Sequence, residues 1–169
     1  MQKQSSARVR AVVAGIVGVA IIVGAMLWYG IYHRSDSVIL KEAYTHAASA
    51  TATGNYSRAY SYLKDSEAHA YRNAQKVTLY GELAAAAANV GTLNEAIDYY
   101  TMRHTLDSST VLPDAELLAD LYERVGSVSL AIEQYQLARE YVSGQPPSLA
   151  REARIATYDE IVRRLEQHP

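Results

Sequence analysis

Three segments of the chain share one sequence pattern at nearly constant spacing. Each begins with a glycine and carries an alanine five residues later and a leucine or tyrosine four residues after that; they are 54–63, 91–100 and 126–135. The three glycines are 37 and 35 residues apart. A period of this length predicts helix–turn–helix units that must stack, because each unit cannot bury its apolar side alone. We therefore expect an elongated all-α array, whose surfaces suit the binding of other proteins.

Apolar periodicity and turn residues divide this region into helix pairs. Each repeated glycine falls in the turn within a pair, where a residue with positive φ ends the first helix. Pro113 lies at a helix start, and residues 144–147 interrupt the chain before a final helix. The predicted helices are 38–53 with 56–71, 73–90 with 93–106, 113–125 with 127–142, and a last helix at 147–167.

The small and large residues of these helices resemble the motif of the tetratricopeptide repeat (TPR) family over about residues 40–146. The third repeat matches at Leu118, Ala119, Tyr122, Gly126, Ala131, Tyr135 and Ala138. The second matches at Tyr80, Leu83, Ala84, Ala87, Gly91, Ala96 and Tyr100, and the first at Ala43, Ala47, Ala50, Gly54, Ala59 and Leu63. The sequence departs from the motif at His46, Ser66 and Arg103.

The resemblance implies an α-solenoid of about three TPR-like helix pairs, at 40–72, 77–110 and 112–146, with a capping helix at 147–169. Small residues would let the two helices of a pair approach closely, and large ones would fill the gaps to the next pair. The capping helix is expected to bury an apolar stripe against the third repeat: Leu149, Ala153, Ala156, Ile161 and Leu165.

Residues 11–32 contain no charged side chain. As a helix they would be about 33 Å long, which exceeds the roughly 30 Å of a bilayer core. Trp28, Tyr29 and Tyr32 lie at the end of the run, where an aromatic belt would lie. The alternative is a cleaved signal peptide, but its apolar region would be shorter and residues 28–37 offer no convincing cleavage site. The sequence predicts an uncleaved signal-anchor: a transmembrane helix joined to the repeats by a linker at 33–39.

Positive charge predicts the orientation of this helix. The basic flank 1–10 contains Lys3, Arg8 and Arg10 and no acidic residue, whereas Arg34 is followed closely by Asp36. This bias favours an N-in single-pass membrane protein with its repeat domain outside the cytoplasm, in the periplasm if the source is bacterial.

Small residues recur four positions apart within the same run, at Ala14 with Gly18 and at Ala20 with Gly24. Such pairs let two membrane helices pack closely, which would allow a homo-oligomer through the span. The alternative is that they have no specific role, since glycine and alanine are common in membrane helices.

In the TPR family the first helix of each repeat forms the concave binding surface. Carried over by position, this surface consists of Lys41, Tyr44, Ala48, Thr51, Thr78, Gly81, Ala85, Ala88, Asn89, Glu116, Asp120 and Glu123. The last three share one helix face, and are interpreted either as an acidic patch for a basic or polar partner segment or as an ordinary solvated face. The five alanines 84–88 are interpreted as a tightly packed helix, or alternatively as the smooth floor of a groove.

Composition excludes several classes of function. The chain has 169 residues, a formal net charge of −2 and no cysteine, and its histidines lack metal-ligand spacing. No phosphate-binding loop or nucleophile motif is present, and basic residues do not cluster with aromatic ones. The sequence therefore predicts no enzyme, no cofactor or metal, and no nucleic-acid partner.

The function predicted from the sequence is a membrane-tethered scaffold. The span would hold the repeats at the lipid bilayer, and the concave face would bind a segment of a membrane-associated protein partner in a membrane or envelope complex. The alternative is a structural accessory subunit of a membrane complex, whose transmembrane helix carries the main contact.

Overall fold

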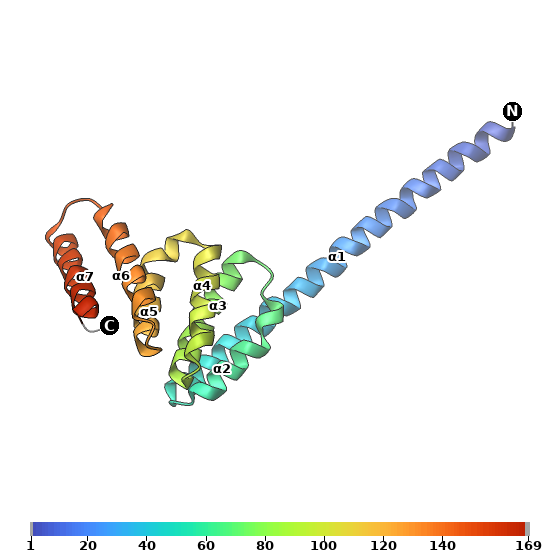
Figure 1. Cartoon of the computed structure of the whole chain (residues 1–169). Coiled ribbons are helices and arrows are strands. Elements are labelled where there is room, and N and C mark those ends of the chain that lie inside the picture. Colours follow the sequence, from blue (N-terminus) through green and yellow to red (C-terminus); the bar gives the residue numbers. More distant parts are fainter. Residues whose placement is uncertain (1, 168–169) are drawn as a thin grey trace.

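The computed structural model describes the backbone of residues 2–167 and the side chains of residues 21–31 and 36–167. Its helices follow one another with short connections (Figure 1). The α-helices are α1 (Gln2–Ala52), α2 (Tyr56–Asp65), α3 (Asn73–Val90), α4 (Leu93–Leu106), α5 (Val111–Arg124), α6 (Val128–Ser143) and α7 (Leu149–Gln167). Two short 3₁₀ helices, η1 (Glu67–His69) and η2 (Ser108–Thr110), lie in the connections after α2 and α4.

The helices pack as three consecutive pairs, α1 with α2, α3 with α4, and α5 with α6. Neighbouring pairs join where α2 meets α3 and where α4 meets α5, and α7 packs on α6 at the end of the row (Figure 1). Each pair turns at a glycine with positive φ: Gly54 at 72°, Gly91 at 94° and Gly126 at 76°. These turns and the repeat-like, all-helical solenoid confirm that part of the sequence prediction.

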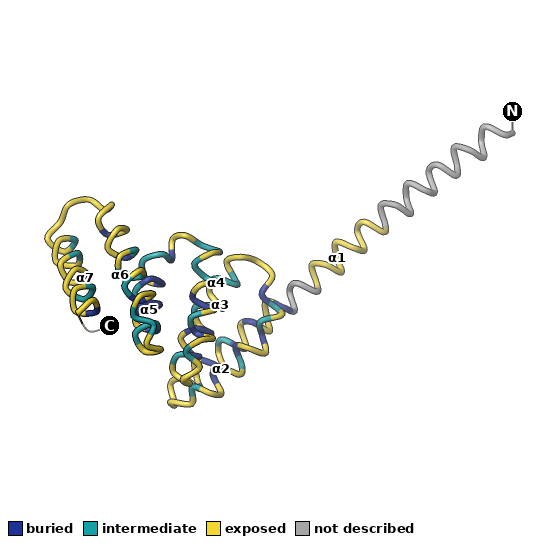
Figure 2. Tube along the Cα trace, viewed as in Figure 1, coloured by how far each residue is buried: buried dark blue, intermediate teal, exposed yellow. Residues whose placement is uncertain are grey.

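Buried positions lie where helices face one another (Figure 2), and most of them are alanine or leucine. Ala84 and Ala87 of α3 and Ala96 of α4 are fully buried, which lets the two helix backbones approach closely. Leu79 and Leu83 are also fully buried and extend this core. The C-terminal end has a smaller apolar cluster of Ala115, Ala138, Val142 and Tyr158.

The predicted membrane localisation is wrong on the evidence of the described residues. Within that part of the chain, no helix has both the length and the apolar character needed to cross a bilayer. Of the predicted span 11–32, side chains are described for residues 21–31, which rise about 16 Å as a helix against a bilayer core of about 30 Å. Residues 11–20 and 32 lie outside the described side chains. The single-pass, N-in assignment and its anchoring role are therefore not retained.

Two further expectations differ from the structure. The predicted linker 33–39 is helical, because α1 runs without interruption from the N-terminal region into the first repeat (Figure 1). The capping helix forms as α7, but its buried residues are Tyr158 and Leu165, and Leu149 is 87% exposed. The apolar stripe predicted for this helix is thus mostly replaced by one large aromatic side chain.

Candidate functional site

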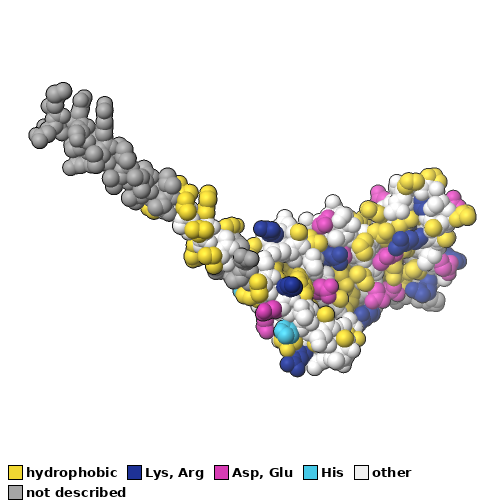
Figure 3. Space-filling model, turned by 180° about the vertical axis from the view of Figure 1, so that it is seen from behind, with side chains coloured by type: hydrophobic (Ala, Val, Ile, Leu, Met, Phe, Trp, Pro, Cys, Tyr) yellow, Lys and Arg dark blue, Asp and Glu magenta, His cyan; other side chains and the backbone are white. Residues whose placement is uncertain are grey.

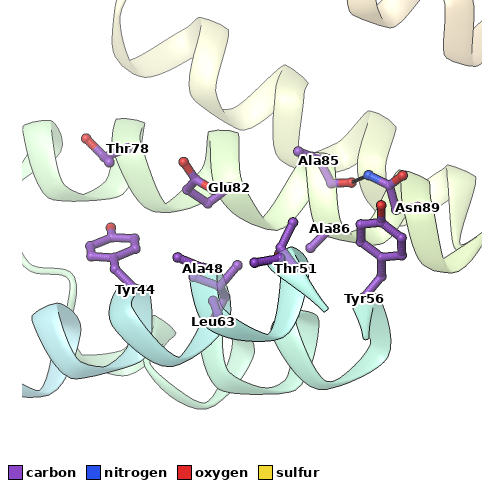
Figure 4. A pocket seen from close by; sticks show the side chains of 12 residues that line it. Tyr44, Ala48, Thr51, Tyr56, Leu63, Thr78, Glu82, Ala85, Ala86 and Asn89 are labelled. Carbon is purple, nitrogen blue, oxygen red and sulfur yellow. Dashed lines mark hydrogen bonds between the residues drawn. The ribbon is translucent and has the colours of Figure 1, made fainter. Parts of the chain in front are cut away.

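A groove of about 570 Å³ lies between α1 and α3. These two helices form its walls, and both pack on α2, which contributes Leu63 to the floor and Tyr56 to one end (Figure 4). Most of the lining side chains are short, so the space between the walls stays open. The lining consists of Tyr44, Ala47, Ala48, Thr51, Ala52, Tyr56, Leu63, Thr78, Glu82, Ala85, Ala86 and Asn89.

The two walls face each other in the register of the repeat. Tyr44 lies opposite Thr78, and Thr51 lies near Ala85 (Figure 4), an offset of 34 positions in both cases. Ala48 and Glu82 show the same offset. This constant offset follows from the stacking of equivalent helices, which run in the same direction along the groove.

A second compartment of about 330 Å³ continues the groove toward the start of the first repeat. Tyr44 and Thr78 line both compartments and so mark the boundary between them. The rest of the smaller compartment keeps the 34-residue register, with Leu40 and Lys41 on α1 and Ala74 and Gln75 on α3; Ser37 completes the lining.

The groove carries little charge. Glu82 is the only charged residue that lines the larger compartment, and Lys41 is the only one that lines the smaller. Burial raises the pKa of the Tyr44 hydroxyl, and the nearby Glu82 carboxylate adds to that rise. Asn89 donates from its side-chain amide to the Ala85 carbonyl at 2.8 Å, which fixes it at one end of the wall.

The structure brings together most of the residues predicted for the first two repeats. Tyr44, Thr51, Thr78, Ala85 and Asn89 line the larger compartment, and Lys41 lines the smaller one with two of them. The alanine run divides by helix face: Ala84 and Ala87 are packed in the core, Ala85 is exposed in the groove, and Ala86 is buried at the edge of the groove that it lines.

Gly81 lies elsewhere. A Cβ at this position would come within 3.0 Å of Nη1 of Arg103, so the residue faces α4 rather than the groove. Its lack of a side chain makes room for a long one from the neighbouring helix. Among the predicted helix-packing residues of the N-terminal run, Gly24 has nothing within 4 Å of a built Cβ, while Ala14, Gly18 and Ala20 lie outside the described side chains.

The three predicted acidic residues of α5 are separate from this groove. Glu116 accepts from Arg154 at 2.8 Å and from the Tyr158 hydroxyl, both on α7. Glu123 accepts from Tyr135 at 2.8 Å, and Asp120 is exposed beside Arg124. Acidic and basic side chains are interspersed on the molecular face shown in Figure 3, so no large area of one sign forms there. The two glutamates therefore stabilise the C-terminal end of the array.

Sequence reasoning missed half of the groove lining: Ala47, Ala52, Tyr56, Leu63, Glu82 and Ala86. A signal for Glu82 and Ala86 was present, since adding the 34-residue period to Ala48 and Ala52 leads directly to them. Tyr56 and Leu63 belong to the second helix of the repeat, which the position-based transfer did not consider.

Comparison with known proteins shows the fold and leaves the family open. No family model matches the chain, and no curated protein matches it. Among solved structures, a crystal structure of PcrH in complex with the chaperone binding region of PopD is similar, with a TM-score of 0.58 and 17% sequence identity. The match covers 76% of this chain and 91% of that one. At this identity the likeness establishes a TPR-like helical-repeat fold.

Proposed function

We propose that this chain is a protein-interaction module that holds a segment of a partner protein in the groove between α1 and α3. The observation that carries the proposal is the open space of about 570 Å³ between two helices at equivalent repeat positions. Binding sites are usually concave and mostly apolar, so an open groove lined largely by alanine, threonine and tyrosine is suited to an external occupant.

The similar solved structure also supports the binding of a partner segment. In that structure PcrH, which has a similar fold, is in complex with a region of another protein. The lining of the larger compartment also favours binding over chemistry, because it contains a single carboxylate and no histidine, lysine or cysteine. Among the described residues, no three His, Cys, Asp or Glu side chains are grouped to hold a metal ion. We therefore propose that the protein acts without catalysis.

Site-specific photo-cross-linking tests the proposal. A photoreactive amino acid at Ala85 should cross-link a partner that mass spectrometry can identify, with the cross-linked peptide mapped to one segment of that partner. Thr51→Trp, which fills the groove from the opposite wall, should abolish the cross-link. Thr101→Trp is the matched control, because Thr101 is exposed on α4 outside the groove lining. Equal cross-linking in both variants would contradict the proposal.

The accessory-subunit alternative is favoured by a separate observation. The side chains of Ile21, Met26, Leu27, Trp28 and Ile31 on α1 are each more than 60% exposed, which leaves an apolar helical surface uncovered in the isolated chain. In this second candidate function, α1 carries the main contact with a partner subunit or with a second copy of the chain. Leu27→Ser would then remove the partner while Thr51→Trp left it bound, and cross-links within a dimer would identify a second copy.

A further inference from the structure

The two compartments together form one channel along α1 and α3. The lining residues run from Ser37 to Ala52 on α1 and from Ala74 to Asn89 on α3. At 1.5 Å per helical residue, each wall is about 22 Å long. An extended chain rises about 3.3 Å per residue, so about seven residues would span this length.

The boundary between the compartments decides between a helical and an extended occupant. Tyr44 and Thr78 face each other there across the channel (Figure 4) and divide it into spaces of about 570 and 330 Å³. A helix with its side chains is about 10–12 Å wide. An extended chain is narrower, so the side chains that meet at the boundary obstruct it less.

The boundary also offers a polar contact that an extended backbone can satisfy. The Tyr44 hydroxyl is buried and has no hydrogen-bond partner among the described residues. Buried hydroxyls normally have a partner, because an unpaired one carries a desolvation cost. The backbone of an extended segment at this position presents carbonyl groups to which the hydroxyl can donate.

The two charged residues of the channel, Lys41 and Glu82, lie on opposite walls and at different positions along its length. The Lys41 ammonium and the Glu82 carboxylate form no hydrogen bond or ion pair with the described residues. In the repeat register, Glu82 on α3 lies opposite Ala48 on α1, which is seven residues after Lys41. The two charges are therefore about 10 Å apart along the channel. Three residues of extended chain cover about the same distance, and side chains three positions apart point to opposite sides.

We infer that the channel takes an extended segment of about seven residues in which one acidic and one basic side chain are three positions apart. The acidic side chain pairs with Lys41 and the basic one with Glu82, while small or apolar residues contact the alanine and threonine lining. This inference rests on the proposed function and specifies the chemistry of the partner segment.

An array of immobilised heptapeptides tests the inference with the full chain as the labelled probe. Each peptide holds one aspartate and one lysine in an alanine and valine background, at spacings from one to six residues and in both orders. We expect the strongest binding at a spacing of three, in one order. Lys41→Glu or Glu82→Lys alone should weaken it about two- to fivefold, as expected for partly exposed ion pairs.

The decisive variant is the double charge exchange Lys41→Glu with Glu82→Lys, which should reverse the preferred order of aspartate and lysine. The matched control exchanges charges outside the channel, Lys76→Glu with Glu133→Lys, and should leave the order unchanged. Binding without a preferred spacing or order, no binding to any peptide, or an order unaffected by the double exchange would overturn the inference. If Thr51→Trp still abolishes the cross-link from Ala85 to the partner in that case, the groove proposal stands, and if Thr51→Trp leaves that cross-link unchanged, both fail.

Discussion

The first groove of the array is open, whereas the later ones are bridged by long side chains. Between α1 and α3, most of the facing residues are short, as Thr51 with Ala85 shows (Figure 4). Between α3 and α5, Nη2 of Arg124 donates to the Ala88 carbonyl at 3.2 Å. The repeat therefore fixes where a groove can form, and side-chain length decides whether it is open to a partner.

Bridging continues toward the C-terminal end of the molecule. Arg103 on α4 reaches Oδ1 of Asp114 on α5 at 3.1 Å, and Asp114 is fully buried. Burial raises the pKa of the Asp114 carboxyl, while Thr110 and the Arg103 guanidinium act against that rise. Glu116 then connects α5 to α7 through Arg154 and Tyr158. These contacts favour a rigid C-terminal end of the array. The short residues of the first groove favour an N-terminal end that can adapt to a partner.

Breaking the buried ion pair between Arg103 and Asp114 is expected to have the largest effect on stability. Arg103→Ala should lower the free energy of unfolding by about 3–5 kcal/mol, because it leaves the Asp114 carboxylate buried without its cation. Urea denaturation measures the change, and Arg139→Ala is the control, since its ion pair with Asp159 is about half exposed on both sides. A loss below about 1 kcal/mol for Arg103→Ala would show that the pair does not hold α4 against α5.

A smaller effect is expected for the link between α5 and α7. Glu116→Ala removes the acceptor of Arg154 and Tyr158 and should cost about 1–2 kcal/mol, reduced by the partial exposure of the ion pair. Hydrogen exchange should show faster exchange in α7 and little change in α3, because α7 packs mainly on α6. Uniform acceleration across all helices would mean that α7 does not open independently.

The same link predicts a dependence on alkaline pH. Burial raises the pKa of the Tyr158 hydroxyl to about 12, and its hydrogen bond to Glu116 adds to the rise. An unfolded tyrosine ionises near pH 10, so this contribution to stability is complete below pH 10 and is lost as the pH rises toward 12. Thermal unfolding from pH 8 to 12 should show a shallower decline in Tyr158→Phe than in the unchanged chain. Identical slopes would exclude Tyr158 as a source of the pH dependence.

The sequence predicted the parts of this comparison that depend on the backbone. The positive φ of Gly91 and the 34-residue register between Tyr44 and Thr78 both follow from the repeat. The sequence could not show which long side chains would reach from one helix to another. Gly81 was predicted to face a partner because of its position, yet it makes room for Arg103, itself a departure from the repeat motif. The two departures compensate in space, and only a structure places them together.

The acidic face of α5 shows the same limit within one helix, and it provides the smallest predicted effect. Glu116 and Asp120 are one helical turn apart and look equivalent in sequence, but Asp120 is 64% exposed and its ion pair with Arg124 is 3.6 Å long. Asp120→Ala should therefore change the free energy of unfolding by less than about 0.5 kcal/mol in the same urea experiment. A cost equal to that of Glu116→Ala would mean that the negative charge of the whole α5 face, rather than the contacts of Glu116 with α7, stabilises this end of the array.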